Sequence, residues 1–169
     1  AQGDGGVSAD ALGAILNWLQ ERNGFVFVVA TANDVRALPP ELLRKGRFDE
    51  LFFVDLPTSS ERVAIVKASL AQYGRTDMID AGKVAQATEG FTGSEIAALV
   101  PDALFAAFAD NERALTTADL VTAAATVTPL SKTAADKIEG LRQWAKGKAR
   151  PANAPEATAS GKGRTLDLD

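Results

Sequence analysis

The chain has 169 residues, of which 46% are hydrophobic and 24% are charged, a composition typical of globular proteins. Its 18 Lys and Arg against 22 Asp and Glu give a formal net charge of −4, which argues against a basic nucleic-acid-binding surface. The absence of cysteine and histidine excludes disulfides, thiolate metal sites and catalysis by Ser-His-Asp or Cys-His groups. Any chemistry must therefore rest on carboxylates, arginines, lysines, amides, hydroxyls and backbone groups.

The first part of the chain combines one helical pattern with two short apolar runs. An amphipathic helix is predicted from the spacing of Leu12, Ile15, Leu16 and Leu19. The runs "FVFVVAT" (25–31) and "ELFFVDL" (50–56) are apolar on both faces, as in buried strands of a parallel sheet. Two such strands cannot cover their own faces or pair their edges, so either another chain completes the sheet or, as we expect, the chain is the C-terminal part of a larger α/β domain.

The rest of the chain is predicted to be mainly helical. Helices are expected at 59–73, 81–88, 92–109, 116–124 and 131–148. The N-terminal caps expected for three of them are Asp80, Thr92 and either Thr116 or Thr117. Pro101 should kink or split the helix that contains it. The final stretch, rich in Pro, Ala, Gly and Ser, predicts disorder.

Three polar residues flank the two apolar runs. Asn33 follows the first run, and Arg44 and Arg47 precede the second. Taken singly, Asn33 is a turn residue and the arginines complement a helix dipole. Taken together they indicate a ligand site, because ligands of open α/β sheets collect beyond the carboxyl ends of the strands. A permanently charged guanidinium also suits the charge on a phosphoryl group in transfer.

These residues carry a resemblance to a known family. The strings "VFVVATAND" and "LPPELLRKGRFDELFFVDLPTSSER" resemble the second half of an AAA+ ATPase core, and the likeness extends over about residues 6–125. The Arg-x-Gly-Arg-Phe-Asp segment is highly specific to this family. The strings "WLQERNGFVFVVATANDV", "PLSKT", "LRQWA" and "ARPA" are particularly similar to the Ycf-type AAA proteins of cyanobacteria, plastids and other bacteria.

The resemblance implies roles at individual positions. Asn33 matches the sensor-1 residue, which helps to place the attacking water near the γ-phosphate. Arg44 matches the arginine finger, supplied in trans to the next subunit's nucleotide, and Arg47 matches the second arginine of that motif. Gly93 and Ser94 lie where family members pack backbone against adenine and ribose.

The resemblance also implies ATP and Mg²⁺ as cofactors. The chain contains neither the phosphate-binding Gly-x-x-x-x-Gly-Lys-Ser/Thr loop nor an apolar strand ending in Asp-Glu. We therefore expect both cofactors to be held mainly by residues upstream of Ala1, and we assign no metal ligand within the chain. For the same reason the chain alone is expected to be inactive.

The expected fold is α/β plus all-α. It comprises part of a P-loop NTPase-type parallel sheet with two strands (1–58), a helical lid (59–128), a C-terminal helix (129–150) and a disordered tail (151–169). The longest apolar run is far shorter than the ~18 residues of a membrane span, so we expect a cytoplasmic protein without a membrane partner.

The function that the resemblance implies is ATP hydrolysis in a homo-oligomeric ring, a hexamer in this family's usual form, coupled to remodelling of a protein substrate. The alternative is a non-catalytic interaction module that binds or caps a partner AAA+ ATPase. Nucleic-acid remodelling is disfavoured, because Lys146, Lys148 and Arg150 form only a small basic cluster, typical of the end of a solvated helix.

Overall fold

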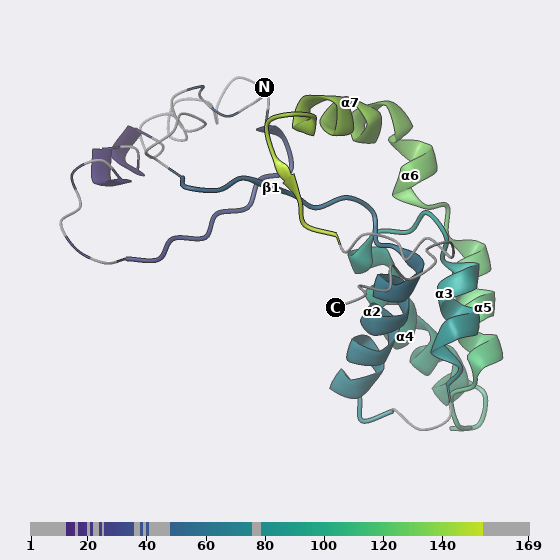
Figure 1. Ribbon diagram of the computed structural model, residues 1–169. Coiled ribbons are helices and arrows are strands. Elements are labelled where there is room, and N and C mark those ends of the chain that lie inside the picture. Colours follow the sequence, from purple (N-terminus) through teal and green to yellow (C-terminus); the bar gives the residue numbers. More distant parts are fainter. Residues whose placement is uncertain are drawn as a thin grey trace, which may run out of the picture. The chain divides into compact units, whose positions relative to one another are not determined.

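The computed structural model describes residues 13–15, 17–19, 21, 24, 26–35, 38, 40, 48–75 and 79–153. The chain divides into two compact units, one formed by 1–52 and 140–150 and the other by 53–139 and 151–169. We call the second one the helical unit (Figure 1). Among the described residues no helix is both long enough and apolar enough to cross a bilayer.

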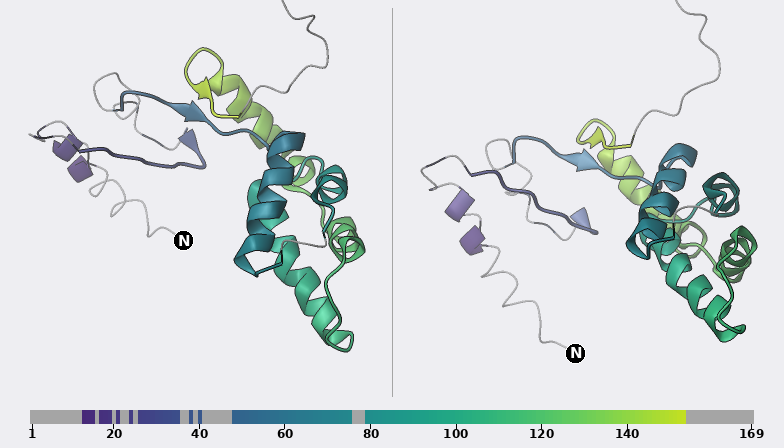
Figure 2. Two further views of the ribbon diagram at one scale, coloured as in Figure 1. Left: turned by 60° about the horizontal axis from the view of Figure 1, so that its bottom comes forward. Right: turned by 90° about the horizontal axis from the view of Figure 1, so that it is seen from below.

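The helical unit is built on four helices that surround one core. They are α2 (Ser59–Gln72), α3 (Ala81–Ala87), α4 (Gly93–Ala109) and α5 (Thr117–Thr126). Helix α2 packs against α3 and α4, and α5 packs against the same two helices, so the four form a closed arrangement (Figure 2). The helices expected near 81–88, 92–109 and 116–124 are thus confirmed within a residue or two at each end.

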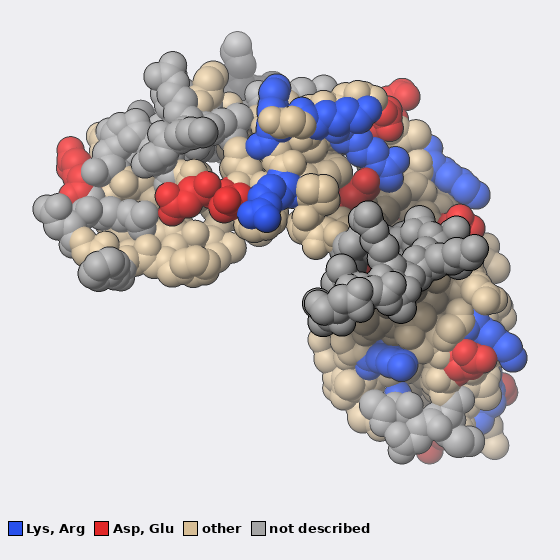
Figure 3. All heavy atoms as spheres, in the orientation of Figure 1, with Lys and Arg blue, Asp and Glu red and all other residues tan. Residues whose placement is uncertain are grey.

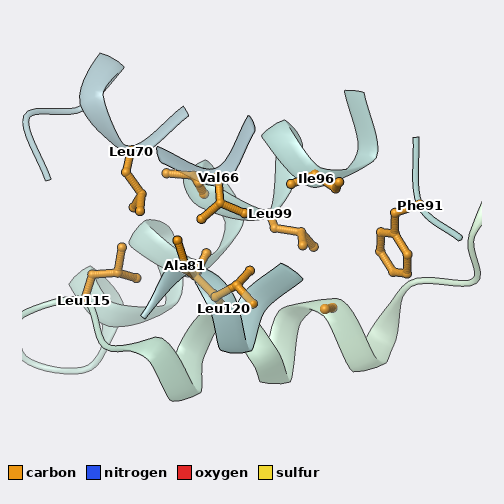
Figure 4. Close-up of a cluster of buried hydrophobic side chains, with 12 residues drawn as sticks. Val66, Leu70, Ala81, Phe91, Ile96, Leu99, Leu115 and Leu120 are labelled. Atoms are coloured by element: carbon orange, nitrogen blue, oxygen red, sulfur yellow. The ribbon is translucent and has the colours of Figure 1, made fainter. Parts of the chain in front are cut away.

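The core of this unit is apolar and draws on all four helices and the turns between them. Figure 4 shows the side chains of Val66, Leu70, Leu99 and Leu120 directed toward one another. Leu120 is completely inaccessible to solvent. Each side chain of this size contributes about 1.5–3 kcal/mol when fully buried, so the core is the main source of stability of the unit.

Three of the helices begin with a capping box, in which a threonine side chain and a carboxylate three residues later satisfy each other's backbone N–H groups. The pairs are Thr58 with Glu61, Thr92 with Glu95 and Thr116 with Asp119. Helix α3 is capped by Asp80, whose side chain accepts from the N–H groups of Gly82 and Lys83. The expected caps are confirmed, and of the two threonines considered for α5 the cap is Thr116.

Two helix predictions change with the structure. Of the kink or split expected at Pro101, the split is wrong, because α4 runs without interruption through this residue. Val100, directly before Pro101, and Ala103, two residues after it, are buried, so packing holds the helix across the missing backbone hydrogen bond. The segment 131–148 is not one helix, because Ala134 has non-helical dihedral angles and separates α6 (Leu130–Thr133) from α7 (Ala135–Ala145).

One of the two predicted strands is seen. Within the described residues the sheet has two strands, β1 (Phe52–Phe53), which lies in the predicted run 50–56, and β2 (Arg150–Pro151), which was not predicted. The described residues 26–31 are extended but not paired as a strand, and Phe27 is 93% exposed. Two parallel strands with mainly helical structure are therefore confirmed, whereas the strand expected at 25–31 is not formed in its described part.

The pairing geometry explains why β2 can contain a proline. The N–H of Arg150 donates to the carbonyl of Leu51 at 2.8 Å, and the N–H of Ala152 donates to the carbonyl of Phe53 at 2.8 Å. Both strands advance by two residues between these bonds, so they are parallel. Pro151 lies between the two donors, where no N–H is needed. Ordered backbone continues to Asn153, three residues beyond Arg150, while the rest of the predicted tail lies outside the described residues.

The predicted helix in the first part of the chain also forms. Residues 13–15, 17–19 and 21 are helical, and Leu19 of the predicted apolar stripe is buried. Ile15 of the same stripe is 48% exposed. The prediction of a helix here is therefore confirmed for the described residues.

Candidate functional site

The helical unit contains a hollow of about 330 Å³ where α2 and α4 begin. It is lined by residues of the linker (54–58), of α2 and α4, and of residues 151–153, which we call the strap, namely Val54, Asp55, Pro57, Glu61, Ala64, Ile65, Gly93, Ala152 and Asn153. Segments far apart in the sequence thus meet at one place. The hollow is largely open to solvent, and we call it the pocket.

The walls of the pocket are mainly apolar. Val54, Pro57, Ala64 and Ile65 supply hydrocarbon surface. A Cβ at Gly93 would lie 3.5 Å from Cδ1 of Ile65, so the backbone of α4 passes close to α2 here. The described lining includes carboxylates but no lysine or arginine. The pocket therefore suits a flat, uncharged, largely apolar group better than a phosphate.

Asn153 connects three parts of the pocket wall through its side-chain amide. Its Oδ1 accepts from the N–H of Asp55 at 2.8 Å, and its Nδ2 donates to the carbonyl of Leu56 at 3.2 Å. The same Nδ2 donates to Oε2 of Glu61 at 2.8 Å. The strap is thereby joined both to the linker and to the first turn of α2.

Glu61 belongs to two networks at once. Its Oε2 accepts from the N–H of Thr58 at 2.8 Å and from the hydroxyl of Thr58 at 3.0 Å, which closes the capping box of α2. The amide of Asn153 then donates to this same oxygen. A carboxylate that caps its own helix is therefore also the anchor of the strap.

The first turn of α4 is governed by Glu95. Burial alone would raise the pKa of this carboxyl, but hydrogen bonds from Thr92 and from the N–H of Leu130 outweigh it and hold the pKa below the ordinary value. Oε2 accepts from the N–H of Thr92 at 2.7 Å, and Oε1 accepts from the N–H of Leu130 at 2.8 Å. The positive end of the α4 dipole is thus already matched by this carboxylate, so a phosphate would meet a negative charge there.

Of the predicted site residues, one lines the pocket, two are described elsewhere and two lie outside the described residues. Gly93 lines the pocket, and Ser94 follows it on the exposed side of α4, with its hydroxyl 3.1 Å from the hydroxyl of Thr92. Asn33 belongs to the other unit, where it is exposed at a bend that follows the extended residues 26–32. Arg44 and Arg47 lie outside the described residues, so their proximity to Asn33 stays a prediction.

The small basic cluster predicted near the end of α7 has local partners. Lys146 donates to Oε1 of Gln143 at 3.0 Å, and the ammonium of Lys148 lies 5.6 Å from the ring centre of Trp144. Arg150 forms a 3.6 Å ion pair with Glu50. In Figure 3 basic side chains gather over the region of α7. These contacts fit the interpretation of a solvated helix end.

No group of three or more acidic side chains placed to hold a metal ion occurs within the described ranges. The expectation that Mg²⁺ acts as a cofactor therefore rests on the family resemblance alone.

The sequence analysis did not identify Asp55, Glu61 or Asn153 as site residues. Glu61 carries a recognisable signal, since Thr-x-x-Glu marks a capping box, but that signal indicates a helix start and not a pocket. Asn153 lies in a stretch whose composition predicts disorder. The string "ARPA" just before it, part of the family resemblance, is the signal that could have pointed to structure there.

Comparison with protein families gives two matches within the chain. Residues 1–56 match the ATPase family associated with various cellular activities (AAA). Residues 79–122 match the AAA+ lid domain, which corresponds to α3, α4 and much of α5. Together the two matches cover more than half of the chain, in the order expected for an AAA+ core followed by its lid.

Individual relatives agree with these matches. The chain is 40% identical over 156 residues to the AAA domain-containing protein ycf46 of Pyropia yezoensis, covering 90% of this chain and 32% of that protein. It is 40% identical over 147 residues to the ycf46 protein of Trieres chinensis, covering 86% and 29%. Similarity to the ATP-dependent zinc metalloprotease FtsH of Acidothermus cellulolyticus is 40% over 106 residues, covering 60% and 16%.

The chain spans about a third of the length of the ycf46 proteins that it matches. Both halves of the match, the AAA segment and the lid, lie in the expected order along the sequence. The two-strand parallel pairing and the helical unit agree with this order. The chain therefore belongs to the AAA+ family of ATPases.

Proposed function

We propose that the chain forms the C-terminal part of an AAA+ ATPase that works as a homo-oligomeric ring, a hexamer by family resemblance, and couples ATP hydrolysis to remodelling of a protein substrate. The observation that carries the proposal is the pocket beside Gly93, a position where the resemblance puts the adenine and ribose. The matches to the AAA segment and to the AAA+ lid supply the class of reaction.

The pocket fits one part of a nucleotide and not the other. Its apolar walls, Pro57 and Ile65 among them, suit the flat face of a purine, and the backbone at Gly93 allows close approach. Asp55 and Glu61 bring carboxylates rather than cations to its edge, which disfavours phosphate. In the proposed function the pocket therefore holds the adenosine part, and the phosphates with Mg²⁺ lie against other residues.

The residues proposed to act on the phosphates are those of the first part of the chain. Asn33 is proposed as the sensor-1 residue, Arg44 as the finger supplied to the neighbouring subunit and Arg47 as its assistant. An arginine acts here by stabilising negative charge on the transferring phosphoryl group, a contribution of ~10³ or more in rate. Because the phosphate-binding loop is not within this sequence, the chain alone is expected not to hydrolyse ATP.

The test uses the protein encoded by the complete reading frame and two variants, Arg44→Ala and Asn33→Ala. Each variant alone is expected to be strongly impaired in ATP hydrolysis, Arg44→Ala by about 10³. Mixing them should restore activity, because some interfaces then combine an intact Asn33 with an intact Arg44 from the neighbour. The neighbouring residue offers a matched control, and Lys45→Ala should hydrolyse ATP as the wild type does.

Failure of the mixed rings to recover would contradict the action of Arg44 in trans. Loss of nucleotide binding in Arg44→Ala would instead make the residue structural. Absence of hydrolysis in the wild-type protein would favour the alternative of an interaction module.

A further inference from the structure

We propose that Asn153 is the positioning residue of this pocket: it fixes the strap as one wall of the site that receives the adenosine part of the nucleotide. The proposal rests on the nucleotide site proposed above and adds to it a C-terminal residue with a defined task. Ala152 and Asn153 both line the pocket, so the strap is part of its surface and not merely near it.

The side chain of Asn153 continues the ladder where the backbone pairing stops. The last backbone bond joins the N–H of Ala152 to the carbonyl of Phe53. The next bonds are made by the amide of Asn153, which accepts from Asp55 and donates to the carbonyl of Leu56. A primary amide carries the same donor and acceptor as a peptide group, so it can serve as the next rung.

The same amide reaches a helix as well as the linker. Nδ2 donates to Glu61, whose carboxylate caps α2. A bond to a carboxylate is stronger than one between neutral groups. The strap is thus fixed at both sides of the pocket, to the linker and to α2.

The hydrogen bonds of Asn153 indicate that it positions the strap and does not bind the ligand directly. An amide has two N–H donors, and both are used, one by Leu56 and one by Glu61. A ligand could take a donor of Asn153 only by breaking one of these bonds. The residue is therefore expected to act on the ligand through the wall that it holds in place.

The chemistry of the site makes asparagine hard to replace. Asn153→Asp has nearly the same shape but no donors, and it would set a second carboxylate against Glu61 at a contact of 2.8 Å. Asn153→Ala removes all three bonds. Arg150→Ala is the matched control on β2, since Arg150 is exposed and its 3.6 Å ion pair with Glu50 lies at the surface.

The first measurement follows amide hydrogen exchange of the chain by NMR. The N–H of Asp55 donates to Oδ1 of Asn153, so its exchange should be about tenfold faster in Asn153→Ala, the factor expected for loss of one hydrogen bond. Asn153→Asp keeps an acceptor at this position, so its effect is measured by ligand binding. The amides of Leu99 and Leu120 report the core and should keep their protection. Arg150→Ala should leave Asp55 as in the wild type.

The second measurement titrates the same proteins with adenosine, the part of the nucleotide assigned to this pocket, and follows the amides of Gly93 and Asp55. The wild type and Arg150→Ala should show saturable shifts, whereas both Asn153 variants should bind adenosine about tenfold more weakly. The double variant Glu61→Gln with Asn153→Asp exchanges amide and carboxylate between the two positions. It should recover much of the affinity, because glutamine still completes a capping box and can donate to the new carboxylate.

The outcomes separate this proposal from the one on which it rests. If the wild type shows no adenosine shifts at Gly93, the nucleotide pocket itself is overturned, and the present proposal with it. If adenosine binds the wild type and the Asn153 variants equally, although Asp55 exchanges faster in Asn153→Ala, only the positioning role is overturned. Unchanged exchange at Asp55 in Asn153→Ala would overturn it as well, and equal loss of protection at Leu99 would assign Asn153 to folding and not to the pocket.

Discussion

The carboxylate of Glu95 accepts a hydrogen bond from the backbone N–H of Leu130 at 2.8 Å, although 35 residues separate them. Glu95 also closes the capping box of α4, so one side chain both begins a helix and holds a distant segment. Glu61 does the same for α2 and Asn153. In α5 Asp119 caps the helix and binds Arg113 through both carboxylate oxygens, at 2.7 and 2.8 Å.

Acid should destabilise the helical unit through these carboxylates. Hydrogen bonding from Arg113 and Thr116 holds the pKa of Asp119 well below its ordinary value of 3.8, against an opposing effect of burial. The pKa of Glu95 is likewise below 4.5. A carboxyl with a depressed folded pKa stabilises the fold above its unfolded pKa, and this stabilisation is lost as the pH falls through the folded value. Urea midpoints followed by circular dichroism should therefore be flat above about pH 5 and fall below about pH 4.

The matched variant for this pH dependence is Arg113→Ala. It removes the bonds from Arg113 and should make the loss of stability below about pH 4 shallower. An unchanged slope would show that Asp119 does not contribute to the acid transition.

Removal of the Glu95 side chain should be costly. Glu95→Ala breaks the bonds to Thr92 and Leu130, and bonds to charged groups contribute about 1.5–3 kcal/mol to the free energy of unfolding. Urea denaturation at neutral pH measures the loss. The exposed Glu89 provides the control, and Glu89→Ala should change the stability by less than about 0.5 kcal/mol. Equal effects of the two variants would contradict the double role of Glu95.

Arg62 should be sensitive even to a conservative change. Its Nε donates to the carbonyl of Ala85 at 2.8 Å and its Nη1 to the carbonyl of Pro57 at 3.0 Å, so it ties α2 to the end of α3 and to the linker. Lysine has no planar fork and can keep only one of these bonds. We expect Arg62→Lys to lower the unfolding free energy by about 1 kcal/mol and Arg62→Ala by about twice as much. Lys67→Ala on the exposed side of α2 is the control. An Arg62→Lys variant as stable as the wild type would show that the two hydrogen bonds of the Arg62 guanidinium do not stabilise the fold.

Gly90 should not tolerate a side chain. It has a φ of +79°, and a Cβ there would lie 2.7 Å from Oγ of Ser131. Gly74 has a φ of +65° with open space around it, so Gly74→Ala measures the backbone strain alone, about 1–2 kcal/mol. Gly90→Ala should cost more than this, and adding Ser131→Ala should remove only the excess. If the two substitutions lower the free energy of unfolding equally, α6, which carries Ser131, can move away from the new side chain without loss of stability.

Asn33 should matter for turnover and not for nucleotide affinity. In the protein encoded by the complete reading frame, Asn33→Ala is expected to lower kcat by about 10², the effect of removing one polar group that acts in the transition state. The dissociation constant for ATP should not change. Thr31→Ala is the nearby control, and wild-type turnover in Asn33→Ala would contradict the sensor role.

The sequence could predict the parts of the fold that depend on near neighbours. The caps Thr92 and Thr116 and their partner carboxylates lie within four positions of each other, so spacing alone identifies them. The buried face of α4 follows the same logic, because Ile96, Leu99 and Val100 recur at helical spacing. Gly93 lines the pocket, whereas its role toward a nucleotide, which came from family resemblance, stays a prediction.

The parts that could not be predicted depend on distant partners. Nothing in the local sequence of Asn153 shows that its amide binds Asp55, which lies 98 residues earlier. The strand partner of β1 was missed for the same reason, since two residues around a proline carry no strand signal. Composition describes what a segment could do by itself, whereas the strap is ordered by a surface that the rest of the helical unit supplies.

The three capping carboxylates also suggest an order of assembly. Each box closes over a few residues, whereas Glu61 and Asn153 are 92 residues apart, and closing a long loop costs more entropy than closing a short one. The boxes can therefore form while the helices nucleate, and the strap can join only when its binding surface exists. We expect Asn153→Ala to speed unfolding while leaving the refolding rate nearly unchanged. The C-terminal strap would then be the last element to join the helical unit and the first to leave it.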